Sequence, residues 1–336
     1  MQCTTDPTEV LPSIGTDIAT GPHTFRLLEA IGDGGYGSVF LASDRENQRW
    51  AVKVEKFKRS MLHIEVHVLK ATNAADCKHF CTMIAYGATK PFYTFVVMTL
   101  LGRDLHHLRS DQPGKKFSMA TTLRIGKQTI EALEELHNCG FISRDFKPGN
   151  LAPGVGRQRK TIFMYDFGLA RKYEDKYGNI VASRGEIGWR GTQRYGSLNA
   201  HLRLDLSRRD DIESWMYMII EFTRGSLPWR MITDRAEVNQ SKMAARHGTG
   251  RQDLFKGLPS QFDNMLTLID GWAFATKPDY KSLRDSLTVV QTLYGLTGRE
   301  KYDWDEEAYS NTTLTEKRQP SPTGPKDLMA IGTVEE

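Results

Sequence analysis

The sequence predicts a mixed α+β protein with two lobes, a small lobe of antiparallel strands and a larger lobe made mainly of helices. From Phe25 to about Met98 the chain shows short apolar runs rich in β-branched and aromatic residues and interrupted by glycine. After Gly102 apolar residues recur at helical spacing. A strand-rich part joined to a longer helical part implies a cleft at the linker, where ligands usually bind.

The small lobe is expected to contain a sheet and one main helix. Residues 25–44 read as two strands around a glycine loop, and residues 49–57 read as a third strand. Residues 61–72 follow with apolar positions on one helical face. Residues 91–102 predict a buried strand that runs into the linker.

The larger lobe is expected to be built around two long helices. Residues 121–140 have apolar positions on one face and stop at a glycine, where a C-terminal cap belongs. Residues 208–225 are apolar on nearly every side and predict a buried central helix. Further helices fit residues 265–272 and 280–293.

These patterns define the domain boundaries that we expect. The small lobe takes residues 25–98, the linker 99–102 and the large lobe 103–300. Residues 1–24 read as a polar tail, and residues 301–336 read as a second tail that has little to bury and is expected to be disordered.

Composition describes a soluble protein, with 39% hydrophobic and 26% charged residues. The net charge of +4 is too small to argue for a nucleic-acid partner, and no apolar run is long enough to cross a bilayer. The N-terminus lacks the pattern of a signal peptide. We expect a monomer in the cytoplasm, with the nucleus left open.

The four cysteines are scattered, which favours reduced thiols in an intracellular protein over a disulfide framework. Cys77, His79 and Cys81 suggest a metal site by their spacing, but no second pair of ligands accompanies them in the sequence. Buried or half-buried thiols are the favoured interpretation.

A glycine loop separates the first two strands of the small lobe. Gly32, Gly34, Gly37 and Val39 fit the pattern G-x-G-x-x-G-x-V, with Tyr36 at the expected tip. Glycines let a backbone approach phosphate oxygens closely. A plain hairpin turn is the alternative, and a dinucleotide fingerprint is disfavoured because another strand follows where that fold needs a helix.

Lys53 lies at the end of the next predicted strand, where its ammonium group can hold phosphates. It needs a carboxylate to position it. Glu65 is the candidate because it shares a helix face with the apolar residues. Glu55, two residues after Lys53, is the alternative on the same strand, and Glu65 on a solvated helix face also stays open.

The residues with the clearest chemistry follow in the larger lobe, in the order Asp145, Lys147, Asn150 and Asp166. Asp145 can accept or orient a hydroxyl proton, and Lys147 can neutralise a transferring phosphoryl group. Asn150 and Asp166 supply hard oxygen ligands for magnesium. Each residue is common alone, but all four in this order after a glycine loop and a lysine strand form a specific signal.

These motifs resemble those of the eukaryotic protein-kinase superfamily, from about residue 25 to about residue 294. The segment from Arg190 to His201 stands where most kinases carry Ala-Pro-Glu. Together with the preceding Trp189 it reads WRGTQRYGSLNAH, and it is similar to the corresponding segment of the casein kinase 1 group. With GRDLHHLRSDQPGKKFSMATTLRIGKQ and KPDY, it is closest to the tau-tubulin kinase-like branch, including its nematode members.

The resemblance implies a bilobal protein-kinase fold and an enzyme that uses ATP and Mg²⁺ on serine and threonine hydroxyls of proteins. It implies that Thr192 forms a hydrogen bond near Asp145 and Lys147. It also implies that Asp211 on the central helix anchors the catalytic loop, residues 142–150. It also implies an adenine pocket with Met98 as gatekeeper, Leu101 in the linker, Ala152 as floor, and Ile31, Val39 and Ala51 as roof.

Members of the group often favour acidic or phosphorylated substrates. Arg190, Arg194 and Lys242 are therefore predicted to form an anion pocket beside the active site, with further arginines such as Arg184 nearby. The alternative is a solvated basic face.

Ser143 stands where the family usually has histidine. In the family, that histidine aligns the magnesium loop, which is Asp166-Phe167-Gly168 here, and does no chemistry, so we expect an active kinase. A catalytically weak scaffold that binds nucleotide or phosphopeptide remains the alternative. A small-molecule kinase is disfavoured because the peptide-binding segment of residues 190–201 is intact.

Overall fold

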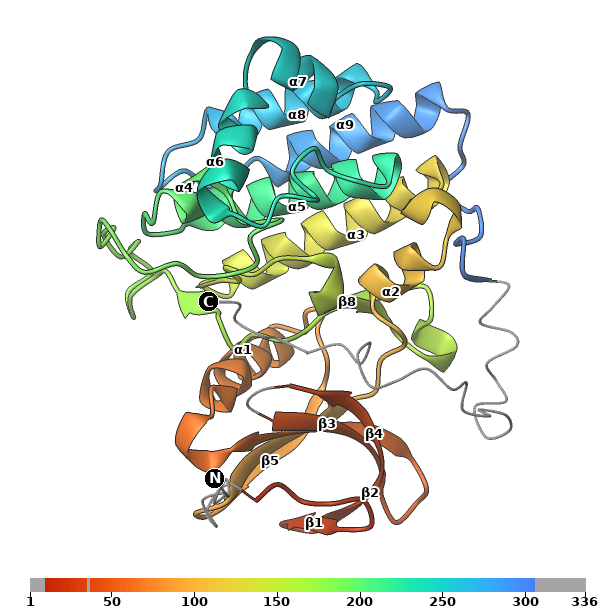
Figure 1. Cartoon of the computed structure of the whole chain (residues 1–336). Coiled ribbons are helices and arrows are strands. Elements are labelled where there is room, and N and C mark those ends of the chain that lie inside the picture. The colour runs from red at the N-terminus through yellow and green to blue at the C-terminus, as the bar shows by residue number, and fades with distance from the viewer. Residues whose placement is uncertain (1–9, 35–36, 306–336) are drawn as a thin grey trace, which may run out of the picture.

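The computed structural model describes residues 10–34 and 37–305 and contains both expected lobes (Figure 1). A strand-rich small lobe, red to orange, lies below a helical large lobe that runs from yellow to blue. The predicted fold class, an antiparallel small lobe joined to a helical large lobe, is confirmed.

The small lobe is a six-stranded antiparallel sheet with the strand order β1-β2-β3-β4-β6-β5. Its alternating apolar residues, among them Phe25, Val52 and Val97, form a core on one face. Helix α1 (Leu62–Ala74) packs beside β5 and β6. The strands are β1 Asp17–Thr20, β2 His23–Asp33, β3 Gly37–Ser43, β4 Arg49–Lys56, β5 Met83–Thr89 and β6 Tyr93–Thr99.

The prediction that residues 1–24 form a tail is wrong for residues 17–20. Strand β1 lies inside residues 1–24 and pairs with β2, with Ile18 opposite Phe25. Ile18 is buried in the sheet core, which explains the pairing. A four-residue strand with one buried apolar residue has too weak a pattern to be recognised from sequence.

The large lobe is built on α3 and α5, which correspond to the two long helices that the sequence predicts. The Ser118 side chain caps α3, and a capping box between Ser207 and Asp210 starts α5. Gly225 ends α5 in the left-handed conformation, with φ of 92°. The helices are α2 Leu105–Ser110, α3 Met119–Asn138, α4 Leu198–His201, α5 Arg208–Arg224, α6 Arg235–Ala244, α7 Gly248–Leu254, α8 Ser260–Asp270 and α9 Tyr280–Leu293.

Short strand pairs and single turns lie at the junction of the lobes and carry the loops of the site. The strand pairs are β7 Phe141–Ile142 with β10 Arg171–Lys172, and β8 Leu151–Pro153 with β9 Ile162–Met164. The 3₁₀ turns are Phe57–Arg59, Pro113–Lys115, Pro148–Asn150 and Gly156–Gln158.

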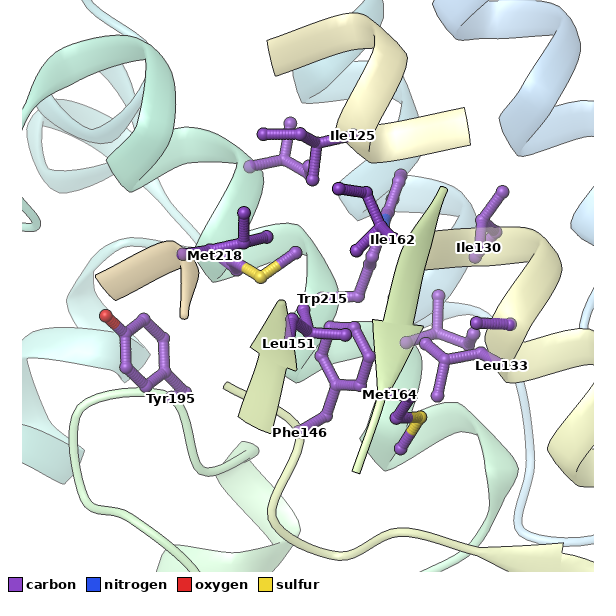
Figure 2. Close-up of a cluster of buried hydrophobic side chains, with 14 of the residues drawn as sticks. Ile125, Ile130, Leu133, Phe146, Leu151, Ile162, Met164, Tyr195, Trp215 and Met218 are labelled. Atoms are coloured by element: carbon purple, nitrogen blue, oxygen red, sulfur yellow. The ribbon is translucent and has the colours of Figure 1, made fainter. Parts of the chain in front are cut away.

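A dense apolar core lies directly beneath these loops (Figure 2). Trp215 is fully buried in α5, and its indole N–H donates to Thr129 of α3 at 3.0 Å. Phe146 and Leu151, which flank the loop between them, also point into this cluster. Because both ends of the loop are anchored in packed core, the polar side chains between them are held in place.

The predicted C-terminal tail also begins too early. Tyr302 and Trp304 are 2% and 4% exposed, and the Trp304 ring lies 5.4 Å from that of Phe117. Asp303 accepts a hydrogen bond from the backbone of Ser118 at 2.6 Å, at the start of α3. The folded domain therefore includes residues 301–305, and the rest of the predicted tail, 306–336, lies outside the described residues.

Within residues 10–34 and 37–305, no helix is both long and apolar enough to cross a membrane. In the same ranges, Cys77, Cys81 and Cys139 are free thiols, with Cys81 buried and the other two half-buried.

Candidate active site

Lys53 stands at the centre of a charged cluster between the lobes. Its Nζ lies 2.8 Å from Oε2 of Glu65 on α1 and 2.9 Å from Oδ1 of Asp166. The alternative partner, Glu55, is 3.8 Å away, and its Oε2 accepts the backbone N–H of Met61 at 2.7 Å. The structure therefore brings Glu65, not Glu55, into hydrogen-bond contact with Lys53.

Charge balance keeps Lys53 and Asp166 ionised, whereas burial raises the pKa of Glu65 above its ordinary value. Burial alone would lower the pKa of Lys53, but Asp166, Glu65 and Glu55 outweigh burial and raise it above its ordinary value. Burial alone would raise the pKa of Asp166, but Lys53 lowers it overall. The ammonium group and the Asp166 carboxylate are thus both charged at neutral pH.

Asp145 forms a second cluster with Lys147 and Thr192. Its Oδ1 accepts from the Thr192 backbone at 2.9 Å and from the Thr192 hydroxyl at 2.8 Å. Lys147 Nζ lies 2.8 Å from Asp145 Oδ2 and donates to the Thr192 hydroxyl at 3.1 Å. Burial raises the pKa of Asp145 despite the opposing effect of Lys147. A raised pKa makes this carboxylate a better proton acceptor than an exposed aspartate.

The backbone beside both carboxylates is held in an uncommon conformation. Arg144 and Asp166 have φ of 66° and 61°, in the left-handed region that most residues avoid. Gly191, with φ of 89°, lies so close to the catalytic loop that an added Cβ would be 2.6 Å from the Arg144 carbonyl oxygen. Only glycine fits there, and it lets Thr192 reach Asp145.

Ser143 occupies a buried position in this loop and is 4% exposed. Its hydroxyl oxygen accepts the Asp145 backbone N–H at 3.4 Å, which is a long contact. Phe167, in the magnesium loop, stacks on Phe80 with ring centroids 5.6 Å apart. Phe80 thus supplies packing for Phe167 within the buried apolar core.

A cavity of about 90 Å³ lies under the glycine loop, between the two charged clusters. An added Cβ at Gly37 would lie 1.9 Å from the Val54 carbonyl oxygen, so β3 can approach β4 this closely only with glycine. Tyr36, the expected tip, lies outside the described residues. Predicted residues that line the cavity are Gly32, Gly34, Gly37, Val39, Lys53, Asp145, Asp166 and Thr192.

Of the predicted adenine residues, Val39 lines that cavity, whereas the others do not: Ile31, Ala51, Met98, Leu101 and Ala152. Ala51 and Met98 are paired across β4 and β6, and both are buried. Leu101 bridges to Gly154, and Ala152 on β8 is 1% exposed. Ile31 on β2, predicted as part of the roof, is 45% exposed.

Asn150 and Asp166 present oxygen atoms that fit a magnesium ion. The Asn150 amide donates from Nδ2 to the Asp145 carbonyl oxygen at 3.0 Å, which leaves its Oδ1 available. Asp166 uses Oδ1 toward Lys53 and keeps Oδ2. One carboxylate and one amide oxygen suit a hard cation that retains water ligands.

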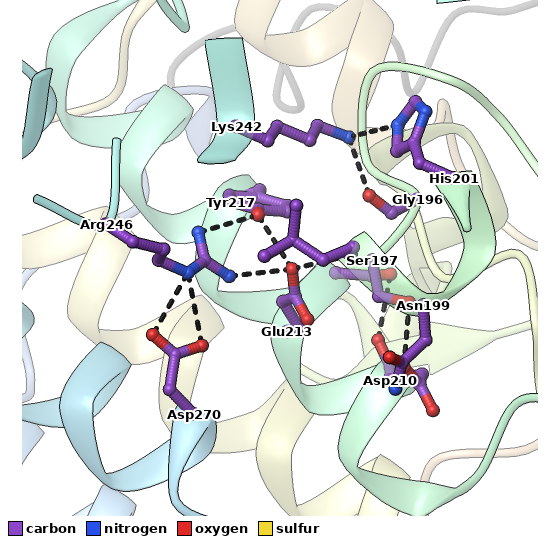
Figure 3. A network of polar contacts seen from close by, with 12 residues as sticks. Gly196, Ser197, Asn199, His201, Asp210, Glu213, Tyr217, Lys242, Arg246 and Asp270 are labelled. Atoms are coloured by element: carbon purple, nitrogen blue, oxygen red, sulfur yellow. Dashed lines mark hydrogen bonds and ion pairs between the residues drawn. The ribbon is translucent and has the colours of Figure 1, made fainter. Parts of the chain in front are cut away.

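The prediction that Lys242 belongs to the anion pocket is wrong (Figure 3). Lys242 is fully buried, and its Nζ donates to the carbonyl oxygens of Gln193 and Gly196 at 2.7 and 2.6 Å. The nitrogen also lies 3.1 Å from His201 Nε2. Burial lowers the pKa of Lys242 well below its ordinary value. Lys242 therefore supports residues 190–201, the predicted peptide-binding segment (the substrate segment), from inside and cannot reach a bound anion.

Arg190 lines a basic cavity of about 680 Å³ beside the catalytic loop, but Arg194 does not. Arg194 lies 3.8 Å from the buried carboxylate of Glu221 instead. Sequence reasoning missed Arg144 and Arg171 as lining residues, although they directly precede Asp145 and closely follow Asp166. The basic residues of the cavity are His67, Arg144, Arg171, Lys172, Arg184 and Arg190.

Comparison with known proteins agrees with this geometry. The family model described as "Protein kinase domain" matches residues 25–273. The serine/threonine-protein kinase spe-6 of Caenorhabditis elegans is 37% identical over 289 residues, which are 84% of this chain and 76% of that protein. A probable serine/threonine-protein kinase of Dictyostelium discoideum is 36% identical over 291 residues, 85% of this chain and 57% of that protein. Both relatives carry the enzyme class that the sequence predicts, and the chain belongs to the protein kinase family.

Proposed function

We propose that this chain is an ATP-dependent serine/threonine protein kinase of the casein kinase 1 group, on its tau-tubulin kinase-like branch. It transfers the γ-phosphoryl group of ATP to serine and threonine hydroxyls of other proteins. The observation that carries the proposal is that Lys53, bonded to Glu65, and Asp145, paired with Lys147, line one cavity under the glycine loop.

Asp145 acts on the substrate hydroxyl. Its ionised carboxylate accepts the hydroxyl hydrogen and directs the oxygen in line with the terminal phosphorus. The new oxygen–phosphorus bond forms as the bond to the leaving diphosphate breaks, and the hydroxyl proton passes to Asp145. Thr192 and Lys147 fix the carboxylate, and Lys147 also faces the negative charge that the transferring group carries.

Lys53 and the glycine loop act on the nucleotide. The ammonium group, held by Glu65, is placed to bind phosphate oxygens, while loop glycines allow a close backbone approach. The apolar side chains of Ala51, Met98 and Ala152 suit a flat base. Magnesium held by Asn150 and Asp166 would neutralise phosphate charge when bound.

The substrate segment supports membership of the casein kinase 1 group and a protein acceptor. Ser197 donates to Asp210 Oδ1 at 2.8 Å, and Asn199 donates to the same oxygen at 3.0 Å. Asp210 belongs to the first turn of α5, so the Ser-Leu-Asn segment is fixed on the central helix. A rigid segment beside Thr192 suits an extended peptide better than a small molecule.

The basic cavity supports a preference for acidic or phosphorylated sites. The pKa of Arg144 is lowered to about 10 by burial and by the neighbouring Arg190, Arg171 and Arg184. A bound phosphate would relieve this repulsion and accept bidentate bonds. Asp205 pairs with Arg171 and Arg184 and offsets part of the charge. A solvated basic face is the alternative.

The serine at position 143 favours an alternative function, that of a catalytically weak scaffold that binds nucleotide or phosphopeptide. The position lacks the histidine that helps to align the magnesium loop in the family. The contacts of Asp145, Lys147 and Asp166 support the active enzyme over this candidate.

Phosphoamino-acid analysis tests the proposal. The purified chain is incubated with radiolabelled ATP, Mg²⁺ and a mixture of acidic proteins, and labelled residues are separated after hydrolysis. Label on serine and threonine is expected. Label on tyrosine alone, or on small molecules alone, would contradict the proposed acceptor. A monomer in the cytoplasm, with the nucleus left open, stays a prediction that gel filtration and imaging can check.

A further inference from the structure

A group of three possible metal ligands lies at the junction of the lobes, away from the active site. His79 stands in the segment between α1 and β5, and Glu131 and Glu135 stand on α3. The two glutamates are one helical turn apart and therefore share a face. One nitrogen of His79 and one carboxylate oxygen from each glutamate all lie within 4.8 Å of one another.

The His79 ring has a fixed orientation and an unused nitrogen. The side chain is fully buried, and Nδ1 lies 2.7 Å from the Ile162 carbonyl oxygen. A carbonyl can only accept, so Nδ1 carries a proton, and in a neutral ring the lone pair is then on Nε2. Within the parts of the chain that the structure describes, Nε2 is buried and makes no hydrogen bond.

Glu131 faces that lone pair. Its Oε2 lies 3.3 Å from His79 Nε2, outside hydrogen-bond geometry. Two electron-pair donors at this distance repel each other unless a cation stands between them. The Glu131 side chain is 46% exposed, so an ion from solvent can reach the site.

Glu135 is held in place by the same backbone segment that carries the histidine. Its two carboxylate oxygens accept the backbone N–H groups of Lys78 and His79, each at 3.1 Å. A carboxylate offers about four lone-pair positions, so these two bonds leave others for an ion. Hydrogen bonds of this kind orient a metal ligand in advance.

We propose that His79, Glu131 and Glu135 bind one divalent transition-metal ion, with zinc as the best match. Zinc bonds of roughly 2.0–2.2 Å in a tetrahedron put ligand atoms about 3.3–3.5 Å apart, the separation found between His79 Nε2 and Glu131 Oε2. Imidazole favours zinc over magnesium or calcium. A water molecule completes the fourth position.

A proton is the competing cation, because a doubly protonated His79 would form an ion pair with Glu131. The Lys78 Nζ lies 3.9 Å from Glu131 Oε2, and its positive charge opposes the binding of a cation. The Lys78 side chain is 57% exposed, however, and can turn away. Zinc bound by thiols is the other competitor, since the Sγ atoms of Cys77 and Cys139 lie 3.8 Å apart. Burial raises the pKa of Cys77 to about 12, which disfavours the thiolate that zinc needs.

The site is independent of the proposed kinase activity and has a structural consequence. His79 follows the helix that carries Glu65, and the two glutamates belong to the large lobe. A bound ion would cross-link this segment to α3. Because the unfolded chain does not assemble the three ligands, binding would raise the unfolding temperature.

Zinc titration of the metal-free full chain by calorimetry, without ATP or magnesium, tests the proposal. One zinc ion per chain is expected, with binding weakened more than about tenfold in both Glu131→Gln and Glu135→Gln. The matched control is Glu134→Gln on the same helix, which should bind as wild type. Zinc should raise the unfolding temperature of wild type and Glu134→Gln but not of Glu131→Gln.

Two spectroscopic readouts separate the competing cations. Co²⁺ in place of zinc should give no thiolate charge-transfer band, and nitrogen NMR of the His79 ring should show a neutral ring without metal. Equal zinc binding in wild type and Glu131→Gln would overturn the proposal. So would loss of binding in Cys77→Ser alone, or a doubly protonated His79 ring that zinc does not change.

Discussion

The Oδ2 atom of Asp211 accepts a hydrogen bond from the backbone N–H of Ser143 at 2.7 Å. Oδ1 of the same carboxylate accepts the N–H of Arg144 at 2.8 Å, and His137 Nε2 lies 2.9 Å from Oδ2. The central helix thus holds the catalytic loop through its backbone. This anchoring does not depend on which side chain stands at position 143.

Replacement of Ser143 by alanine should therefore leave turnover within about threefold of wild type, because the hydroxyl makes only a long 3.4 Å contact. Asp211→Asn is the contrasting variant. It places an N–H₂ group among buried donors and should lose about 1–3 kcal/mol of stability together with most activity. Steady-state kinetics and urea unfolding measure both. A larger loss in Ser143→Ala than in Asp211→Asn would contradict this view of the loop.

Glu65→Gln should lower kcat/KM for ATP by about 10–100-fold, since a charge-assisted bond to Lys53 is worth roughly 1.5–3 kcal/mol. Glu55→Gln is the matched control. Glu55 lies 3.8 Å from Lys53, and a glutamine oxygen can still accept the Met61 N–H. Kinetics at varied ATP compare the two variants, and equal losses in both would show that Glu65 has no special role.

Arg190→Gln should reduce kcat/KM on a phospho-primed peptide about tenfold and leave the unprimed peptide nearly unchanged, because a bidentate contact to phosphate is lost. Arg203→Gln is an exposed control in the same region that does not line the basic cavity. Paired assays on the two peptides measure the ratio. Equal turnover of both peptides by wild type would rule out the proposed preference for phosphorylated substrates.

Stability should fall as the pH drops below about 6.5 because of His201. Burial and the adjacent Lys242 lower the pKa of this histidine from 6.5 to about 3. The folded state thus keeps His201 neutral where the unfolded state binds a proton, so its contribution is full above pH 6.5 and declines toward pH 3. Urea unfolding at several pH values measures the slope. His201→Gln should flatten it, and an unchanged slope would exclude His201 as a source.

Local patterns predicted those parts of the site that lie close together in sequence. Asp145, Lys147 and Asn150 share one short loop, so their spacing alone placed them together. The choice between Glu65 and Glu55 needed the fold, because it depends on where α1 places Glu65 relative to Lys53. Thr192 reaches Asp145 only through the close approach at Gly191, and the resemblance, not spacing, suggested that contact.

Long-range packing explains what the sequence could not predict. Lys242 lies on α6, a mostly polar helix that was not predicted. The buried Lys242 ammonium group depends on hydrogen bonds to the carbonyl groups of residues 193 and 196. His79 similarly gains its neighbours from α3, more than fifty residues later in the chain. In both cases the decisive partners come from another element, so local periodicity carries no signal of them.

Single-turnover phosphotransfer shows whether the chain is an active kinase with serine at position 143. Wild type, Asp145→Asn and Asp166→Asn are mixed with radiolabelled ATP, Mg²⁺ and an acidic peptide, and nucleotide binding is measured in parallel. We expect transfer by wild type, transfer reduced by more than about a hundredfold in both variants, and nucleotide binding retained by Asp145→Asn. Wild type that binds ATP but transfers no phosphate at high enzyme concentration would contradict this expectation.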